Sequence, residues 1–209
     1  TSGQVLDLQR FGHASQEGIV ALANADELHD YTYRVAGCVG GFWTRMCQRK
    51  LFPTSTLDSG ALLADGIRFG RGLQLVNILR DIPRDLREGR CYLPADELAE
   101  AGLRPADLLS AENMGRLRPV YTRWLDRADA HLVAGWRYTN GLPFTQWRLR
   151  LGCAWPVLIG LGTIKRLRRE PVLDPTHRVK VSKAEVRRII FQTLVRYPFQ
   201  PAWRRLGSE

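Results

Sequence analysis

Residues 70–94 read GRGLQLVNILRDIPRDLREGRCYLP, and in this stretch polar side chains recur on one side of an otherwise apolar helix. Gln74, Asn77, Asp81 and Asp85 are spaced three, four and four residues apart, which places them in one stripe along a helix. Carboxylate and amide oxygens of this kind suit Mg²⁺, which keeps several waters and completes its octahedron with phosphate oxygens. The stretch therefore predicts a long helix able to hold Mg²⁺ against a diphosphate.

A simpler interpretation of the same stretch is a solvent-facing acid pair that is neutralised by Arg80, Arg84 and Arg87. Against it, like charges at this spacing cost about 0.2–0.5 kcal/mol. Acids late in a helix oppose its dipole by about 0.3–1 kcal/mol, and Pro83 removes a hydrogen bond and predicts a kink. Local stability gains nothing from these residues, which favours a functional cause.

A second informative stretch is YTYRVAGCVGG, residues 31–41. It places Tyr31, Val35 and Gly40 along one helix, and Ala36, Gly37 and Gly40 are small enough for a ligand or another helix to approach closely. Plain helix packing and a ligand-lining role are both open on this pattern. A buried tyrosine needs a partner for its hydroxyl, and its ring face can stabilise a cation.

Helical spacing of apolar residues recurs along the rest of the chain, and no segment alternates for long as a strand would. In the first predicted helix the apolar stripe consists of Leu28, Tyr31, Val35, Val39 and Phe42. The predicted helices cover residues 25–47, 57–89, 95–103, 104–109, 114–138, 144–167 and 182–197. The fold class is therefore all-α.

The composition is that of an ordinary globular protein, with 44% hydrophobic and 25% charged residues in a chain of 209. That length predicts a single domain over residues 1–209. No stretch reaches the roughly 18 apolar residues that a membrane span needs. Four cysteines without CxxC pairing indicate reduced thiols and a cytoplasmic protein.

The formal charge of +10 favours an anionic partner. Most of the basic residues follow position 115, where they also fit solvated helix faces. Neither a helix-turn-helix, a zinc motif nor an aromatic RNA-binding signature is present, so nucleic acid is not expected as a partner. Basic helical faces would allow peripheral membrane contact at most. The sequence does not predict an oligomeric state.

Two ordered motifs resemble the signatures of the squalene/phytoene synthases. Residues 31–40 read Y-x-x-x-V-A-G-x-V-G, and residues 70–94 read G-x-x-x-Q-x-x-N-I-x-R-D-x-x-x-D followed by R-x-Y-x-P. The resemblance extends to HRVKVSK at residues 177–183 and covers essentially the whole chain. It implies an isoprenoid synthase-type helical bundle around a central apolar cavity.

The resemblance also implies an activity, the Mg²⁺-dependent head-to-head condensation of two prenyl diphosphates through a cyclopropylcarbinyl diphosphate. Squalene formation from farnesyl diphosphate is the favoured expectation, and phytoene formation from geranylgeranyl diphosphate is the alternative. Squalene-forming members additionally use NADPH, which this family binds without a Rossmann unit.

Site residues follow from the resemblance position by position. Tyr31, Asp81 and Asp85 are the expected catalytic residues, and Asn77, Asp81 and Asp85 the expected Mg²⁺ ligands. The expected substrate-binding residues are Val35, Gly40, Gln74, Asn77 and Arg178. Arg80 and Lys180 fall where squalene-forming relatives contact the phosphates of the nicotinamide cofactor.

Two departures from the family pattern stand out. Arg84 occupies a position where the family usually has glutamate, so one acidic contribution to the metal cluster is replaced by a cation. The family's first aspartate-rich motif lies well upstream of the tyrosine signature, so we expect residues 1–209 to be incomplete at the N-terminus. Asp26 and Asp30 have the D-x-x-x-D spacing but directly precede Tyr31, and we interpret them as part of a helix turn. A domain that only binds prenyl diphosphates or a partner subunit is the competing hypothesis.

Overall fold

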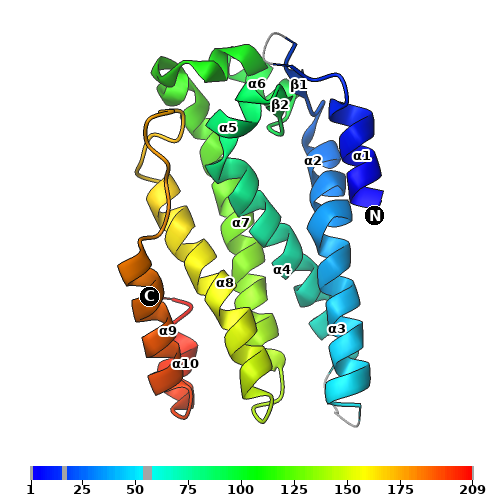
Figure 1. Ribbon diagram of the computed structural model, residues 1–209, viewed down its shortest axis with the longest axis vertical. Coiled ribbons are helices and arrows are strands. Elements are labelled where there is room, and N and C mark those ends of the chain that lie inside the picture. Colours follow the sequence, from blue (N-terminus) through cyan, green and yellow to red (C-terminus); the bar gives the residue numbers. More distant parts are fainter. Residues whose placement is uncertain (1, 16–17, 54–57, 209) are drawn as a thin grey trace.

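The protein folds as a bundle of long helices, seen in the computed structural model for residues 2–15, 18–53 and 58–208 (Figure 1). This confirms the all-α prediction, whereas the assignment of one domain to residues 1–209 stays a prediction. Two long helices run side by side through the middle and two others flank them. The four are α4 (Ser59–Arg80), α7 (Met114–Gly141), α3 (Cys38–Leu51) and α8 (Trp147–Leu167).

The predicted helix over residues 25–47 extends to residue 51 and contains an irregular turn. It consists of α2 (Ala25–Thr32), a π-helical turn η1 (Tyr33–Gly37) and α3. The wider π turn inserts one residue, which rotates the following helix by about 100° relative to a straight α-helix. The predicted apolar stripe is therefore wrong beyond the turn, since Val39 and Phe42 are 56% and 60% exposed. Gly41, Thr44 and Cys47 face the interior instead.

The predicted helix over residues 57–89 is also interrupted. α4 ends at Arg80, Asp81 leaves the helical conformation, and a short helix α5 (Ile82–Arg87) follows with Pro83 in its first turn. Proline has no N–H to donate to the carbonyl four residues earlier, which here belongs to Leu79. The Tyr121 hydroxyl on α7 donates to that carbonyl at 3.0 Å. The break expected at Pro83 is thus stabilised from a neighbouring helix.

One end of the bundle, at the top in Figure 1, carries short elements around α5. Val20 pairs with Arg90 in a two-stranded parallel sheet that the sequence did not predict. Gly89 has φ +79°, and a Cβ atom there would lie 2.4 Å from the backbone nitrogen of Ser15. The elements of this end are α1 (Ser2–Phe11), β1 (Val20–Ala21), β2 (Arg90–Cys91), α6 (Ala95–Glu100), η2 (Pro105–Leu109) and η3 (Ala111–Asn113).

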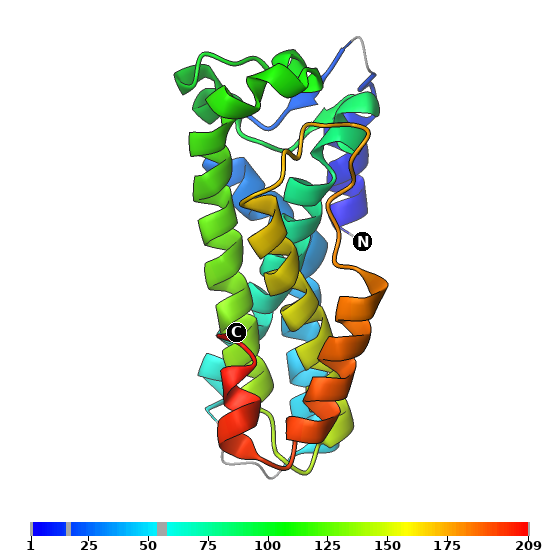
Figure 2. The same cartoon turned by 90° about the vertical axis from the view of Figure 1, so that its left-hand side faces the viewer.

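The opposite end carries the C-terminal helices α9 (Lys183–Arg196) and α10 (Gln200–Arg205), beside the turn between α7 and α8 (Figure 2). Residues 168–182 connect α8 to α9 and climb back towards α5 (Figure 2). Val172, Leu173 and Val179 of this connection are buried in the core, which fixes its path. In the described part of the chain, none of the helices is long and apolar enough to span a bilayer.

All four cysteines are free. Burial raises the pKa of the Cys91 and Cys153 thiols to about 12. These thiols are therefore protonated at neutral pH, which agrees with the expected reduced state. The cytoplasmic location inferred from them stays a prediction.

The continuous segment of α2, η1 and α3 crosses α4 at close range, with small residues at the contact. A Cβ atom on Gly40 would lie 2.1 Å from the Gly66 carbonyl oxygen, and one on Gly70 would lie 2.3 Å from the Ala36 carbonyl oxygen. Both clashes are with backbone atoms, which cannot move without separating the two helices. This crossing favours the packing interpretation of the small residues near Tyr31.

We expect Gly40→Ala to destabilise the protein by about 1–3 kcal/mol, because the added methyl group forces α3 away from α4. Gly152→Ala is the matched control, since a Cβ atom there meets nothing within 4 Å. In an exposed helical position this change should raise stability by about 1 kcal/mol. Urea unfolding followed by circular dichroism measures both, and equal midpoints for the two variants would contradict the packing argument.

Candidate functional site

Asp81 lies at the junction of α4 and α5, where two arginines contact its carboxylate. Arg80 donates from Nε to Oδ1 at 3.0 Å and from Nη2 to Oδ2 at 2.5 Å. Arg178, from the connection between α8 and α9, donates to Oδ1 at 3.2 Å. Burial raises the pKa of Asp81, but the hydrogen bonds and charges of the two arginines outweigh it and hold this pKa below its usual value. Asp81 is therefore an anion held between two cations.

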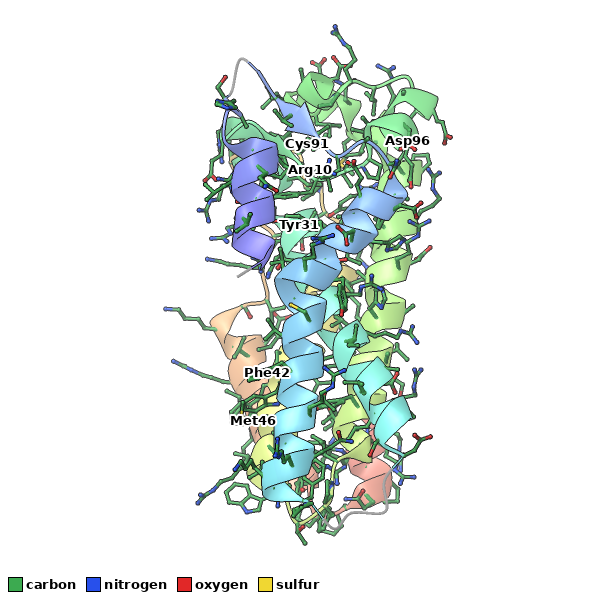
Figure 3. The ribbon with its side chains drawn as sticks, turned by 90° about the vertical axis from the view of Figure 1, so that its right-hand side faces the viewer. Arg10, Tyr31, Phe42, Met46, Cys91 and Asp96 are labelled. Atoms are coloured by element: carbon green, nitrogen blue, oxygen red, sulfur yellow. The ribbon has the colours of Figure 1, made fainter. Side chains whose placement is uncertain are left out.

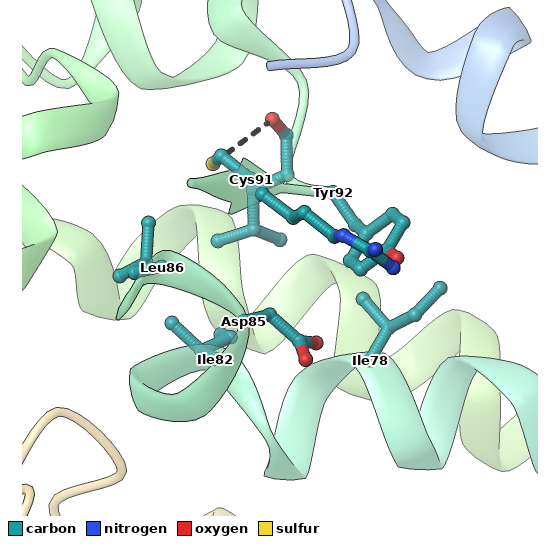
Figure 4. Close-up of a pocket in the computed structure, with 8 residues that line it drawn as sticks. Ile78, Ile82, Asp85, Leu86, Cys91 and Tyr92 are labelled. Carbon is teal, nitrogen blue, oxygen red and sulfur yellow. Dashed lines mark hydrogen bonds between the residues drawn. The ribbon is translucent and has the colours of Figure 1, made fainter. Parts of the chain in front are cut away.

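Asp85 lies one turn further along α5 in a different electrostatic setting. Burial raises its pKa to about 7, and the negative charges of Asp81 and Glu88 add to that rise. Within the described ranges, it forms no ion pair or hydrogen bond with a cation, although Arg84 and Arg90 partly offset the rise from a distance. Figure 4 shows its carboxylate beside Ile78 and facing Tyr92. Asp85 is thus a half-buried carboxylate that lacks a bound counter-charge.

Tyr31 joins the first sequence motif to the second. Its hydroxyl donates to Asp7 Oδ1 at 3.1 Å and lies 3.4 Å from the Tyr92 hydroxyl, with the two ring centroids 4.9 Å apart. Arg90 donates to the other oxygen of Asp7 at 3.0 Å. Burial, first among several causes, raises the pKa of Tyr31 far above its usual value, so the hydroxyl stays protonated. The expectation that a buried Tyr31 needs a hydroxyl partner is confirmed.

Asp7 carries no local sequence signal of this role, because its partners lie 24 and 83 residues away along the chain. Arg90 and Tyr92 were quoted within R-x-Y-x-P without a role. α1 reaches this position because it packs against the α2–η1 segment, beside which it lies in Figure 3. Arg10 on α1 forms an ion pair with Glu27 on α2.

A cleft of about 250 Å³ opens beside Asp81, between the α4–α5 junction and the connection that carries Arg178. Four of its ten lining residues are arginines, and Asp81 and Asp174 are its acidic members. The full lining is Arg80, Asp81, Pro83, Arg84, Arg87, Val172, Asp174, Pro175, His177 and Arg178. Planar guanidinium groups bind phosphate oxygens in pairs, so the cleft suits a phosphorylated ligand.

Three predicted residues are not among those that line this cleft. Gln74 is partly buried on α4, and Asn77 and Lys180 are exposed. Considering only the described residues, no side-chain hydrogen bond or ion pair joins them to Asp81 or Asp85, and the backbone carbonyl of Asn77 accepts from the Asp81 N–H at 2.9 Å. The predicted stripe is broken at Asp81, because the helix ends there. The binding roles of these three residues stay predictions.

Val35 and Gly40 are placed by packing. Val35 is partly buried against the main core, and Gly40 faces the backbone of α4. The structure therefore accounts for Gly40 by the α3–α4 crossing and for Val35 by core packing, and their place beside a substrate stays a prediction.

Arg84 is turned towards Glu88, with its Nε 3.2 Å from Oε1, and both side chains are exposed. It adds positive charge to the cleft instead of a metal-binding oxygen. The described residues contain no group of three His, Cys, Asp or Glu side chains that could hold a metal ion. Asp26 lies in the first turn of α2 and Asp30 pairs with Arg34 at 2.7 Å, which confirms their interpretation as helix-turn residues.

Residues 2–185 match the family described as squalene/phytoene synthase. The chain belongs to the squalene/phytoene synthase family. As a group this family consists of prenyltransferases.

Curated relatives of this squalene/phytoene synthase family member include two plant enzymes. The chloroplastic phytoene synthase of an Oncidium hybrid cultivar is 33% identical over 78% of this chain and 38% of its own length. Chloroplastic phytoene synthase 2 of Solanum lycopersicum is 37% identical over 69% of this chain and 44% of its own length. The chain thus spans less than half the length of these two relatives.

Two solved structures share the fold. The squalene synthase HpnC from Alicyclobacillus acidocaldarius aligns with a TM-score of 0.65 at 22% identity, over 81% of this chain and 57% of that one. A complex of TcSQS with a ligand aligns with a TM-score of 0.76 at 17% identity, over 96% of this chain and 55% of that one. The family fold predicted from the two motifs is confirmed.

Proposed function

We propose that this squalene/phytoene synthase family member binds prenyl diphosphates beside Asp81 and Asp85 and takes part in their head-to-head condensation. The observation that carries this proposal is the cleft in which Arg80 and Arg178 flank Asp81. A site of this composition combines carboxylate oxygens for a divalent cation with guanidinium groups for phosphate oxygens.

The residues of the acid pair fit Mg²⁺. Asp85 is half-buried with a pKa raised to about 7 and has no bound counter-charge in the described part of the chain, so a divalent cation would relieve an unfavourable buried charge. Asp81 keeps its negative charge and would share the ion. Bound there, Mg²⁺ would act as a Lewis acid that neutralises the charge on a departing diphosphate. Asn77 remains the proposed third protein ligand.

The remaining polar residues of the site would bind and position. Arg178 would exchange part of its contact with Asp81 for phosphate oxygens, because its side chain is 61% exposed and lines the cleft. Arg80 would stay on Asp81 and keep it ionised. Tyr31, fixed by Asp7 and Tyr92, would present a polarisable ring to an allylic cation. Apolar side chains such as Ile78 would keep water from that cation.

Two substrates that differ in the length of the prenyl group are candidates. The family resemblance favoured farnesyl diphosphate and squalene, with Arg80 and Lys180 as contacts to NADPH. The curated relatives are phytoene synthases, which favours geranylgeranyl diphosphate. Arg80 is engaged by Asp81, so a role in binding NADPH would require it to be released.

Condensation assays separate these proposals. The chain is incubated with Mg²⁺ and radiolabelled farnesyl or geranylgeranyl diphosphate, with and without NADPH, and apolar products are extracted and identified. We expect a Mg²⁺-dependent condensation product. Mg²⁺-dependent substrate binding without product would support the competing hypothesis of a non-catalytic binding domain. A chain that neither binds nor converts either substrate would contradict the proposed function.

We expect Arg178→Gln to weaken Mg²⁺-dependent binding of pyrophosphate by about tenfold, because a charge-assisted pair of hydrogen bonds is lost. Isothermal titration calorimetry with inorganic pyrophosphate measures this without requiring turnover. Arg169→Gln is the matched control, since Arg169 is an exposed arginine of the same connection and does not line the cleft. If both variants bind pyrophosphate as the wild type does, Arg178 is not a phosphate-binding residue.

A further inference from the structure

Basic side chains from three helices gather near the middle of α4. We name these five residues the side cluster, and they are Arg68 and Arg71 on α4, Arg127 and His131 on α7, and His29 on α2. α4 packs along α7 and against α2, and α2 lies beside α7 in Figure 3. None of the five lines the cleft beside Asp81. Arg71 precedes Asp81 by ten residues, which is about 15 Å along a helix.

The two arginines of α4 are held by backbone carbonyls and an aromatic ring. Arg71 donates from Nη2 to the His29 carbonyl oxygen at 3.0 Å, and its guanidinium carbon lies 5.5 Å from the centre of the Tyr33 ring. Arg68 donates from Nη2 to a backbone carbonyl of α7 at 2.9 Å, and its Nε lies 3.5 Å from His131 Nδ1. Within the described residues, neither arginine forms an ion pair with an acid.

Two guanidinium nitrogens of the side cluster are buried and have no hydrogen-bond acceptor in the part of the chain that the structure describes. They are Arg71 Nε and Arg127 Nη1. The Glu97 carboxylate lies 4.0 Å from this Arg127 nitrogen, which is beyond hydrogen-bond distance, and it already accepts from Arg123 at 3.0 Å. A buried charged donor without an acceptor is destabilising. The side cluster therefore has unused capacity to donate to an anion.

His131 reports an excess of positive charge around it. Burial, the largest cause, and then the charges of Arg68, Arg71 and His29 lower its pKa to about 4. Among the described residues, no acid offsets this fall. The His131 imidazole is therefore neutral at pH 7. Its Nδ1 faces the Arg68 Nε–H, which favours a proton on Nε2 and leaves that nitrogen as a donor.

His29 lies in a related setting with two acids nearby. Burial and then the charges of Arg127 and Arg71 lower its pKa, whereas Asp26 and Glu97 oppose the fall. The acids thus lie towards α2 and α6, the helices that carry them. They balance that edge of the side cluster in part, and the arginines of α4 remain without a bound counter-charge in the described ranges.

We propose that the side cluster binds a phosphate group of a small anionic molecule, at a second site distinct from the one beside Asp81. Guanidinium groups donate paired hydrogen bonds to phosphate oxygens, and a neutral imidazole N–H adds another. The two uncompensated charges of α4 match the nearly double negative charge of a phosphate group at pH 7. The five members offer no carboxylate to a metal ion, so this binding needs no Mg²⁺. It does not depend on the proposed function.

Isothermal titration calorimetry with inorganic phosphate, and separately with pyrophosphate, tests the side cluster. EDTA is present to remove the divalent metal on which the site beside Asp81 depends, and chloride keeps the ionic strength constant. We expect one anion per chain, and at least tenfold weaker binding for Arg68→Gln with Arg71→Gln. The control is Arg45→Gln with Arg49→Gln, which removes the same charge from two exposed arginines of α3.

A second measurement locates the anion without altering an arginine. The chain has four histidines, of which His29 and His131 belong to the side cluster. His177 lines the cleft beside Asp81, and the fourth, His13, lies outside both places. In carbon–proton NMR spectra, phosphate added in the presence of EDTA should shift the imidazole signals of His29 and His131. The signals of His13 and His177 should stay where they are.

Each of three results would overturn the proposal. One is a wild-type chain that binds neither phosphate nor pyrophosphate in EDTA. Another is the double variant of α4, folded by circular dichroism, with the same affinity as the wild type. The last is a shift of His177 while His29 and His131 do not respond, which would place the anion in the cleft beside Asp81.

Discussion

Asp81→Asn is expected to lower the rate of the proposed prenyl diphosphate condensation by about a thousandfold, which corresponds to about 4 kcal/mol of transition-state stabilisation. The substitution keeps the shape of the side chain but removes the negative charge that would share the metal ion. It also leaves Arg80 and Arg178 without their anion, and these lie 2.5 and 3.2 Å from its oxygens. Product formation with labelled substrate measures the effect.

Two accompanying measurements make this prediction specific. Glu88→Gln should leave the rate near the wild-type value, because Glu88 is an exposed acid of the same segment that pairs with Arg84. Binding of inorganic pyrophosphate in the presence of Mg²⁺ should be lost with Asp81→Asn, which reports on the site even without turnover. A folded Asp81→Asn protein with unchanged binding and unchanged rate would show that the diphosphate is bound elsewhere.

Trp203→Ala is expected to lower the free energy of unfolding by about 3–5 kcal/mol, the cost of truncating a fully buried aromatic side chain. The Trp203 ring is stacked on Trp136 at 5.3 Å and meets the edge of Tyr197 at 5.1 Å. Arg150 lies over its face at 5.4 Å, and its Nε1–H donates to Asn140 Oδ1 at 2.9 Å. This single residue of α10 thus connects α7, α8 and the end of α9.

Urea unfolding of Trp203→Ala beside Trp147→Ala measures the difference. Trp147 is an exposed tryptophan of the same end of the bundle, so its truncation should cost far less. Similar midpoints for the two variants would show that α10 adds little to the stability of the bundle.

The sequence predicts the helices well wherever helical spacing and breakers agree. Pro83 indicated a kink, and the helix does end at Arg80, three residues before it. The compensation by Tyr121 could not be foreseen, because the hydroxyl and the Leu79 carbonyl are 42 residues apart. Asp81 was predicted as a functional residue by helical spacing, although α4 ends just before it and Arg178 contacts it from a distant segment.

Long-range placement accounts for what the sequence analysis missed at the candidate site. Arg178 was identified only by resemblance, and its contact with Asp81 spans 97 residues. Asp7 carried no motif, and the short α10 helix with Trp203 was not predicted at all. In each case the deciding contact forms between segments whose relative position depends on the whole fold, which local periodicity does not report.

The π turn at Tyr33–Gly37 means that the packing of α3 depends on the number of residues in the turn more than on which residues they are. Removing any one residue from it would restore regular α-helical winding and rotate everything that follows by about 100°. Thr44 would then leave the Tyr138 hydroxyl, which lies 3.3 Å away, and Gly40 would no longer face Gly66. The number of residues between Tyr31 and Gly40 is therefore itself a structural constraint. A sequence alignment with a gap between them would match either Tyr31 or Gly40 to a residue that faces a different direction.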